Sequence, residues 1–130
     1  MNRPSICVIE DNDILRATLI DLLTSRQFQA RGFFSLDEFL STLSGPLPDI
    51  ILADVLMEGG GGLELIDRLD AAGLQIPVIL MSGSEEPDLS SRAHARGACA
   101  FLRKPFEIQY LFETLDRVRS DAAQAPLFSR

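Results

Sequence analysis

Short apolar runs alternate with stretches of helical spacing along the whole chain. The runs at 5–10, 28–34, 49–54, 76–83 and 99–106 each have the length and the composition of a β-strand. Those at 49–54 and 76–83 are apolar throughout their middle, which is typical of strands covered on both faces. The run at 28–34 is broken by polar residues and predicts a half-exposed strand.

The stretches between these runs predict helices, because their apolar residues recur every three or four positions. Ser35 and Glu38 have the spacing of a capping box at the start of the second helix. Asp13 is expected to cap the first helix, and 85–98 predicts a weak, alanine-rich fourth helix. The four clearer stripes are Leu15, Leu19, Leu22 and Leu23; Leu36, Phe39, Leu40 and Leu43; Leu65, Ile66 and Leu69; and Ile108, Leu111, Phe112, Leu115 and Val118.

Five strands that alternate with five helices predict an α/β protein with a parallel sheet and helices on both faces. We expect a single-domain, doubly wound (βα)5 fold of the flavodoxin-like type, and for its five-stranded parallel sheet we take the order 2-1-3-4-5. The helical pattern fades near Ser120, so residues 121–130 are expected to form a C-terminal tail or the start of a linker.

Composition and charge narrow the classes of partner. The chain has 130 residues and a net charge of −7, which argues against direct binding to nucleic acid or to an anionic membrane surface. No apolar run approaches the roughly 20 residues that span a bilayer. Cys7 and Cys99 both lie in apolar runs and are expected to be small buried hydrophobes in a reducing compartment. These features together predict a cytoplasmic protein.

Acidic residues follow two strands that should be neighbours in the sheet. Glu10 and Asp11 come at the end of the first strand, and Asp54 closes the third. In an open parallel sheet, ligands bind beyond the carboxyl ends of the strands where the strand order reverses, which here lies between strands one and three. Three carboxylates in one pocket repel one another, and a hard cation such as Mg²⁺, shared with a phosphoryl group, relieves that conflict.

The other strand ends fit phosphoryl chemistry. Ser82 ends the fourth strand with a hydroxyl group, and Lys104 follows the fifth with a positive charge. Asp54 is then a plausible nucleophile toward phosphorus, with Mg²⁺ and Lys104 balancing the developing charge. Four glycines at 59–62 allow the following loop to approach the site closely, and only Gly62 is expected to be strictly required.

Four motifs together resemble the receiver domains of two-component response regulators. They are "VIEDN" at 8–12, "DVLMEGGGGLELI" at 54–66, "LMSG" at 80–83 and "FLRKPF" at 101–106. The match runs from about Ser5 to Ser120, so residues 1–120 are interpreted as the receiver domain. Glu58 stands where that family usually has proline, which adds an acid beside the expected pocket.

The resemblance implies a set of roles for the residues at the strand ends. It implies that Asp54 is phosphorylated by a histidine kinase or a histidine phosphotransfer protein, and that Ser82 and Lys104 engage the phosphoryl group. It also implies that Ser82 and Phe101 form the switch. The Mg²⁺ ligands that it implies are Glu10, Asp11, Asp54 and the main-chain carbonyl of Leu56.

The expected output is a switched surface on the fourth helix, the fifth strand and the fifth helix. That surface would act through a homodimer formed on phosphorylation or through an output domain or protein not in this chain. We expect a stoichiometric phosphoacceptor rather than an enzyme, with at most slow self-dephosphorylation.

Two other functional classes remain open at this point. "DND" at 11–13 is similar to the first motif of haloacid-dehalogenase-type phosphohydrolases, although no paired acids follow Lys104 and no cap segment is present. The other class is a phosphorylation-independent, receiver-like interaction module that keeps only the fold.

Overall fold

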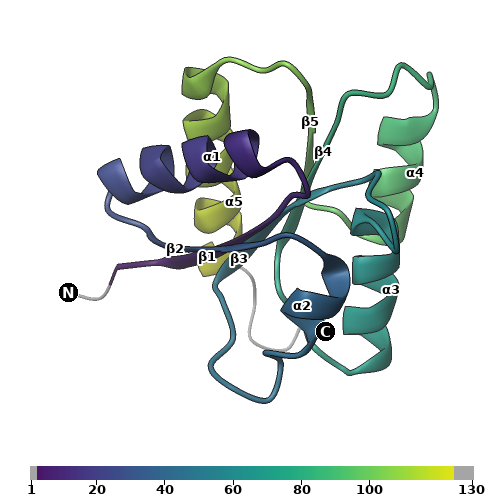
Figure 1. Ribbon diagram of the computed structural model, residues 1–130, viewed down its shortest axis with the longest axis horizontal. Helices are drawn as coiled ribbons and strands as arrows, with labels where there is room; N and C mark the ends of the chain where they lie inside the picture. The colour runs from purple at the N-terminus through teal and green to yellow at the C-terminus, as the bar shows by residue number, and fades with distance from the viewer. Residues whose placement is uncertain (1–2, 125–130) are drawn as a thin grey trace.

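The computed structural model describes residues 3–124, and within them the chain forms five strands and five helices (Figure 1). The strands are β1 (Ser5–Ile9), β2 (Gln29–Phe33), β3 (Ile50–Asp54), β4 (Val78–Ser82) and β5 (Ala100–Arg103). The helices are α1 (Asp13–Ser25), α2 (Leu36–Leu40), α3 (Gly62–Ala71), α4 (Leu89–Arg96) and α5 (Ile108–Gln124).

The sheet confirms the predicted class and topology. All five strands are parallel, in the order β2-β1-β3-β4-β5. Every residue of β3 and β4 is buried, as their uninterrupted apolar runs predicted, whereas the edge strand β2 is mostly exposed. Cys7 pairs with Ile51 and Asp54 pairs with Met81, so the strand ends after β1, β3 and β4 reach the same edge.

Each face of the sheet carries its own hydrophobic core. Helices α1 and α5 cover one face, and α2, α3 and α4 cover the other (Figure 1). Successive residues of β1 point to opposite faces: Cys7 and Ile9 belong to the core under α2, α3 and α4, and Ile6 and Val8 to the core under α1 and α5. Packing on both faces fixes the strand register, because a slip of one residue would exchange the two sets.

Two predicted helix boundaries are wrong by a few residues. The N-cap of α1 is Asn12 rather than Asp13; its side chain accepts the amide of Leu15, and Asp13 instead pairs with Arg16 at 2.6 Å. Helix α2 ends at Leu40 and continues as hydrogen-bonded turns, because only Leu36 and Phe39 of its stripe are buried. Its capping serine is confirmed, with the Glu38 amide donating to Ser35 Oγ at 3.1 Å.

Helix α5 continues past the point at which the apolar pattern fades. It reaches Gln124, so residues 121–124 of the expected tail are helical, and residues 125–130 lie outside the described part of the chain. Four of its predicted stripe residues are buried, whereas Ile108 is 39% exposed at the helix start.

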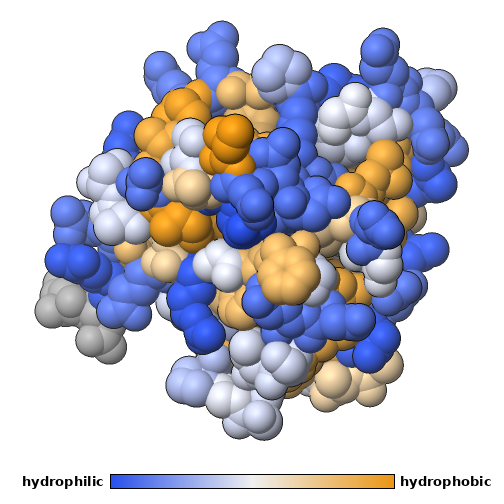
Figure 2. Space-filling view, in the orientation of Figure 1, coloured by the Kyte–Doolittle hydropathy of each residue, from blue (hydrophilic) through white to orange (hydrophobic). Residues whose placement is uncertain are grey.

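The surface is a mosaic of hydrophilic side chains with separate apolar patches, one of them over α1 and α5 (Figure 2). Ile14 in the first turn of α1 is 81% exposed. Among the described residues, no helix combines the length and the apolar character needed to cross a membrane.

The two cysteines differ in their surroundings. Cys7 is buried in β1 as predicted, and burial raises the pKa of its thiol to about 11. Cys99 is exposed, which corrects the expectation that it is a core residue. The reason is its place just before β5, where its neighbours Ala98 and Ala100 turn inward and are buried instead.

Candidate functional site

Four predicted site residues come together at the carboxyl edge of the sheet. Glu10 follows β1, Asp54 ends β3, Ser82 ends β4 and Lys104 follows β5. The central position of these strands buries Glu10, Asp54 and Ser82, whose residues are at most 6% exposed. The topology therefore brings together side chains that lie up to 94 residues apart in the sequence.

Lys104 joins the two buried carboxylates. Its ammonium nitrogen lies 2.7 Å from Glu10 Oε1 and also forms a short ion pair with Asp54 Oδ2. The Lys104 side chain is 20% exposed, so its charge stands at the mouth of the site with the carboxylates behind it. One lysine therefore provides the positive charge for two acids in a partly dehydrated setting.

Backbone amides hold the other oxygen of each carboxylate. The Asn12 amide donates to Glu10 Oε2 at 3.0 Å, and the Leu56 amide donates to Asp54 Oδ1 at 2.8 Å. In both cases the carboxylate accepts the amide of the residue two positions later in the chain, as in an Asx-turn. They fix the rotamers, so that Asp54 keeps one oxygen turned toward Lys104.

Burial and pairing shift two pKa values in the site. Burial raises the pKa of Glu10, and the hydrogen bonds and charge of Lys104 only partly oppose this effect. Burial alone would lower the pKa of Lys104, but its hydrogen bonds to Asp54 and Glu10, and their charges, outweigh burial and raise it. The lysine thus stays protonated, and the cost of burying a carboxylate falls mainly on Glu10.

Asp11 was expected to meet Glu10 and Asp54 in one pocket, but it does not. It is exposed at the rim, and within residues 3–124 no group of three or more acidic, histidine or cysteine side chains is close enough to hold a metal ion. The physical reason is that one lysine can compensate Glu10 and Asp54, whereas a third buried carboxylate would lack a counter-charge.

The donor set nevertheless suits a hard divalent cation. Glu10 and Asp54 present carboxylate oxygens at one edge, with the Asp11 carboxylate and the Leu56 backbone next to them in sequence. Oxygen ligands of this kind are those that Mg²⁺ prefers. The residues therefore fit the metal in type, with Lys104 now providing the positive charge between them.

The glycine-rich loop after Asp54 is shaped by contacts with the backbone. A Cβ at Gly61 would lie 1.8 Å from the Val55 carbonyl oxygen, and one at Gly62 would lie 2.2 Å from Leu80 Cδ2. The prediction that only Gly62 is required is therefore wrong, because Gly61 is the tighter position. This close approach turns the chain back from Asp54 into α3.

Ser82 and Phe101 lie on neighbouring strands that connect the site to α4. Ser82 is fully buried, and its hydroxyl oxygen accepts the Ser84 amide at 3.0 Å. Phe101 is half-buried against the core under α2, α3 and α4, and the bond between Lys104 and Pro105 is cis. Ser82 thus borders the loop that runs from β4 to α4, and Phe101 lines a surface hollow with Ser90 of α4.

Sequence reasoning missed three polar residues that support the site. Asn12 caps α1 and donates its amide to Glu10, and Arg16 donates to the Glu10 carbonyl at 2.7 Å. Arg103 donates to the Ser84 carbonyl at 2.7 Å. A cap residue just before an apolar stripe could have indicated Asn12, whereas no local pattern marks the long-range contact of Arg103.

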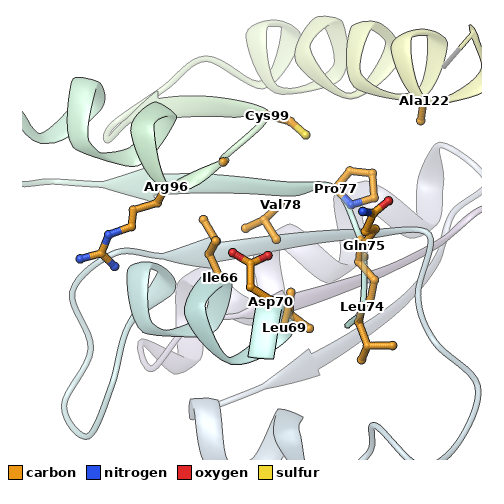
Figure 3. Close-up of a pocket in the computed structure, with 12 residues that line it drawn as sticks. Ile66, Leu69, Asp70, Leu74, Gln75, Pro77, Val78, Arg96, Cys99 and Ala122 are labelled. Carbon is orange, nitrogen blue, oxygen red and sulfur yellow. The ribbon is translucent and has the colours of Figure 1, made fainter. Parts of the chain in front are cut away.

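A separate pocket of about 380 Å³ lies at the opposite edge of the sheet, near the start of β4 (Figure 3). Ile66, Val78 and Cys99 line it, together with Asp70 and Arg96. It contains none of the residues that converge at Asp54, so it is not the site predicted from the strand ends.

Comparison with known proteins agrees with this geometry. A family model for the response regulator receiver domain matches residues 6–116. The chain is 31% identical over 120 residues to the DNA-binding transcriptional regulator NtrC of Klebsiella pneumoniae, covering 92% of this chain and 26% of that protein. It is 36% identical over 102 residues to the transcriptional regulatory protein FixJ of Bradyrhizobium diazoefficiens, covering 78% of this chain and 50% of that protein. The chain thus spans about a quarter to a half of the length of these relatives.

Solved structures show the same fold. A response regulator receiver protein from Burkholderia phymatum is 34% identical, with a TM-score of 0.81 over 91% of this chain and 96% of that one. Full-length FixJ from B. japonicum is 31% identical, with a TM-score of 0.87 over 95% of this chain and 61% of that one.

Proposed function

Since the chain belongs to the response regulator receiver domain family, which in general uses Mg²⁺ for phosphorylation, we propose that Asp54 accepts a phosphoryl group from a partner protein. The single observation that supports this most is the ion-pair arrangement in which Lys104 bridges Glu10 and the last residue of β3. It aims a carboxylate, fixed by a backbone amide, at the exposed end of the site.

The proposed reaction is an in-line transfer. An oxygen of the Asp54 carboxylate forms a bond to phosphorus while the bond from phosphorus to the donor breaks, and the donor keeps that electron pair. Asp54 Oδ2 must exchange its contact with Lys104 for the phosphorus, and the lysine then donates to a phosphoryl oxygen. Glu10 keeps the lysine within reach through its own ion pair.

Glu10, Asp11, Asp54 and the Leu56 carbonyl would hold Mg²⁺ beside this carboxylate. When bound, the ion neutralises charge on the phosphoryl oxygens. The Ser82 hydroxyl would move toward the same oxygens and donate a hydrogen bond to them, which would break the bond that it accepts from the Ser84 amide.

The donor is proposed to be a histidine kinase or a histidine phosphotransfer protein. Three large apolar side chains around the site are exposed: Ile14 is 81%, Leu56 is 59% and Ile108 is 39% exposed. All three follow or lie close to strand ends at the edge that carries Asp54. Exposed apolar groups around a polar centre favour a protein partner over a small-molecule substrate alone.

We propose a stoichiometric phosphoacceptor with at most slow self-dephosphorylation, rather than a phosphohydrolase with rapid turnover. Its readout surface is α4, β5 and α5. Helix α4 suits a switching role because it is short and buries only Leu89 and Ala93. The output is proposed to follow through a homodimer or through an output partner.

Intact-mass measurement with acetyl phosphate tests the proposal. Wild type with Mg²⁺ should gain one phosphoryl group, and the gain should disappear with EDTA or in Asp54→Asn. Asp21→Asn is the matched control, because Asp21 is an exposed aspartate in the middle of α1, and it should behave as wild type. A wild type that gains no phosphoryl mass, or an Asp54→Asn variant that gains as much as wild type, would contradict the proposal.

A further inference from the structure

Arg103 connects two elements that lie on either side of the expected switch. It is the last residue of β5, and its Nη1 donates to the Ser84 carbonyl at 2.7 Å. Ser84 lies in the loop between β4 and α4, 19 residues earlier in the chain. The contact therefore ties the end of β5 to the loop that leads into α4.

The tied residue is itself bonded to the site. The Ser84 amide donates to Ser82 Oγ at 3.0 Å, and Ser84 Oγ accepts the Glu86 amide at 3.2 Å. The backbone of Lys104 donates to the Ser82 carbonyl at 2.8 Å. Movement of the Ser82 hydroxyl toward Asp54 would thus break its bond to Ser84, and Arg103 holds that same residue in place.

The same side chain also reaches the expected switch aromatic. The Arg103 guanidinium carbon lies 6.0 Å from the centroid of the Phe101 ring, close to the limit of a cation–π contact. Both residues line a surface hollow of about 690 Å³ with Ser90 of α4 and Tyr110 of α5. Phe101 is only half-buried, and it faces the same hollow as Arg103.

We propose that Arg103 is a positioning residue that holds the β4–α4 loop and Phe101 in their unphosphorylated arrangement and makes their movements interdependent. This inference rests on the proposed function, because it concerns the switch driven from Asp54. A shift of the loop removes the hydrogen bond that orients the guanidinium, and rotation of Phe101 removes the ring beside it. Each movement therefore lowers the cost of the other.

A second arginine, Arg92, also contacts the β4–α4 loop, but it cannot restrain the loop as Arg103 does. Arg92 pairs with Glu86 and Asp88, but all three belong to α4 or to the loop directly before it. Such pairs can move together with the loop. Arg103 contacts the loop from β5, which is anchored by its pairing with β4, so its contact must break when the loop moves.

Amide hydrogen exchange without any phosphoryl donor tests the restraint directly. Arg103→Met keeps the apolar stem beside Phe101 and removes the donor. The Ser84 and Glu86 amides should exchange about threefold faster or more than in wild type, since their bonds lie in the released loop. Arg68→Met is the matched control, because within residues 3–124 the one ion pair of Arg68 is a 3.9 Å contact inside α3, and it should leave these amides unchanged.

Affinity for Mg²⁺ with beryllofluoride, a mimic of the phosphoryl group, tests the coupling. Arg103→Met should bind about threefold more tightly, because less of the binding free energy is used to release the loop. Unchanged exchange at Ser84 and Glu86 overturns the inference, and so does faster exchange with unchanged or weaker binding. Absence of binding in wild type would contradict the proposed function instead, and the exchange experiment would still decide whether Arg103 restrains the loop.

Discussion

At the scale of single residues, the site is a balance between two buried acids and one lysine. Glu10 is 1% exposed and Asp54 is 6% exposed, and both depend on the ammonium group of Lys104. Burying a charge costs several kcal/mol unless it is paired, so the pairing explains how these acids remain in the fold. The proposed phosphoryl transfer would use the Asp54 carboxylate and the Lys104 cation of this same arrangement.

Removal of the Glu10 charge should stabilise the fold at neutral pH. Burial raises the pKa of Glu10, so the unfolded chain loses this proton at a lower pH than the folded chain does. Wild-type stability therefore falls, relative to Glu10→Gln, as pH rises from the ordinary glutamate pKa through the raised value. A tenfold difference in proton affinity between the folded and unfolded chains corresponds to about 1.4 kcal/mol. Urea unfolding at pH 4 and pH 7 checks this, and a variant that is less stable than wild type at pH 7 would contradict it.

Lys104→Met should destabilise the fold, by about 3 kcal/mol, because it leaves two buried carboxylates without a counter-charge. Adding Glu10→Gln to this variant should recover part of the loss, since one of the unpaired charges is then gone. Urea unfolding of both single variants and the double variant gives the coupling between the two positions. Strictly additive effects would show that the 2.7 Å pair between Lys104 and Glu10 has no energetic role.

At the scale of elements, the loop after β3 determines how Asp54 is presented. It leaves the strand, forms a turn in which the Gly60 amide donates to the Met57 carbonyl at 3.3 Å, and enters α3 at Gly61. The exposed turn at Glu58 and Gly59 lies outside the tight part of this path. The closeness of Gly61 to the Val55 carbonyl, rather than the length of the glycine run, fixes the route.

Two alanine substitutions in this loop should therefore differ. In Gly61→Ala the new methyl group meets the Val55 carbonyl, and we expect a loss of about 2–3 kcal/mol from the backbone shift. In Gly59→Ala the space around the new methyl group is open, and the positive φ of 83° should cost about 1 kcal/mol. Thermal or urea unfolding compares them, and equal losses would show that the contact with Val55 is unimportant.

Elements with strong two-sided or one-sided patterns could be predicted from the sequence. The strands β3 and β4 could be predicted from their uninterrupted apolar runs, and α5 from its apolar stripe. In each case the spacing of the apolar residues alone indicates which faces are buried. The end of α2 was not predictable in this way, since Leu43 continues the stripe without being deeply buried. Exact ends depend on packing against neighbours, as at Asn12, where the cap also serves Glu10.

At the scale of the whole molecule, the parallel sheet creates the site. The strand order β2-β1-β3-β4-β5 places the ends of β1 and β3 side by side. The alternation of strands and helices predicted the parallel sheet, in which the carboxyl ends of all strands lie at one edge. The convergence of Glu10, Asp54, Ser82 and Lys104 could therefore be predicted. The exposure of Asp11 could not, because it depends on how one lysine divides its charge between two buried neighbours.

The carboxyl edge of the sheet is proposed to direct a phosphoryl group to one carboxylate only. Borohydride reduces an aspartyl phosphate to homoserine, so peptide mapping after treatment with acetyl phosphate, Mg²⁺ and borohydride identifies the modified residue. We predict homoserine at position 54, with Asp11 and Asp13 unchanged. Homoserine at position 11 or 13, or none anywhere in a folded protein, would contradict the proposed function.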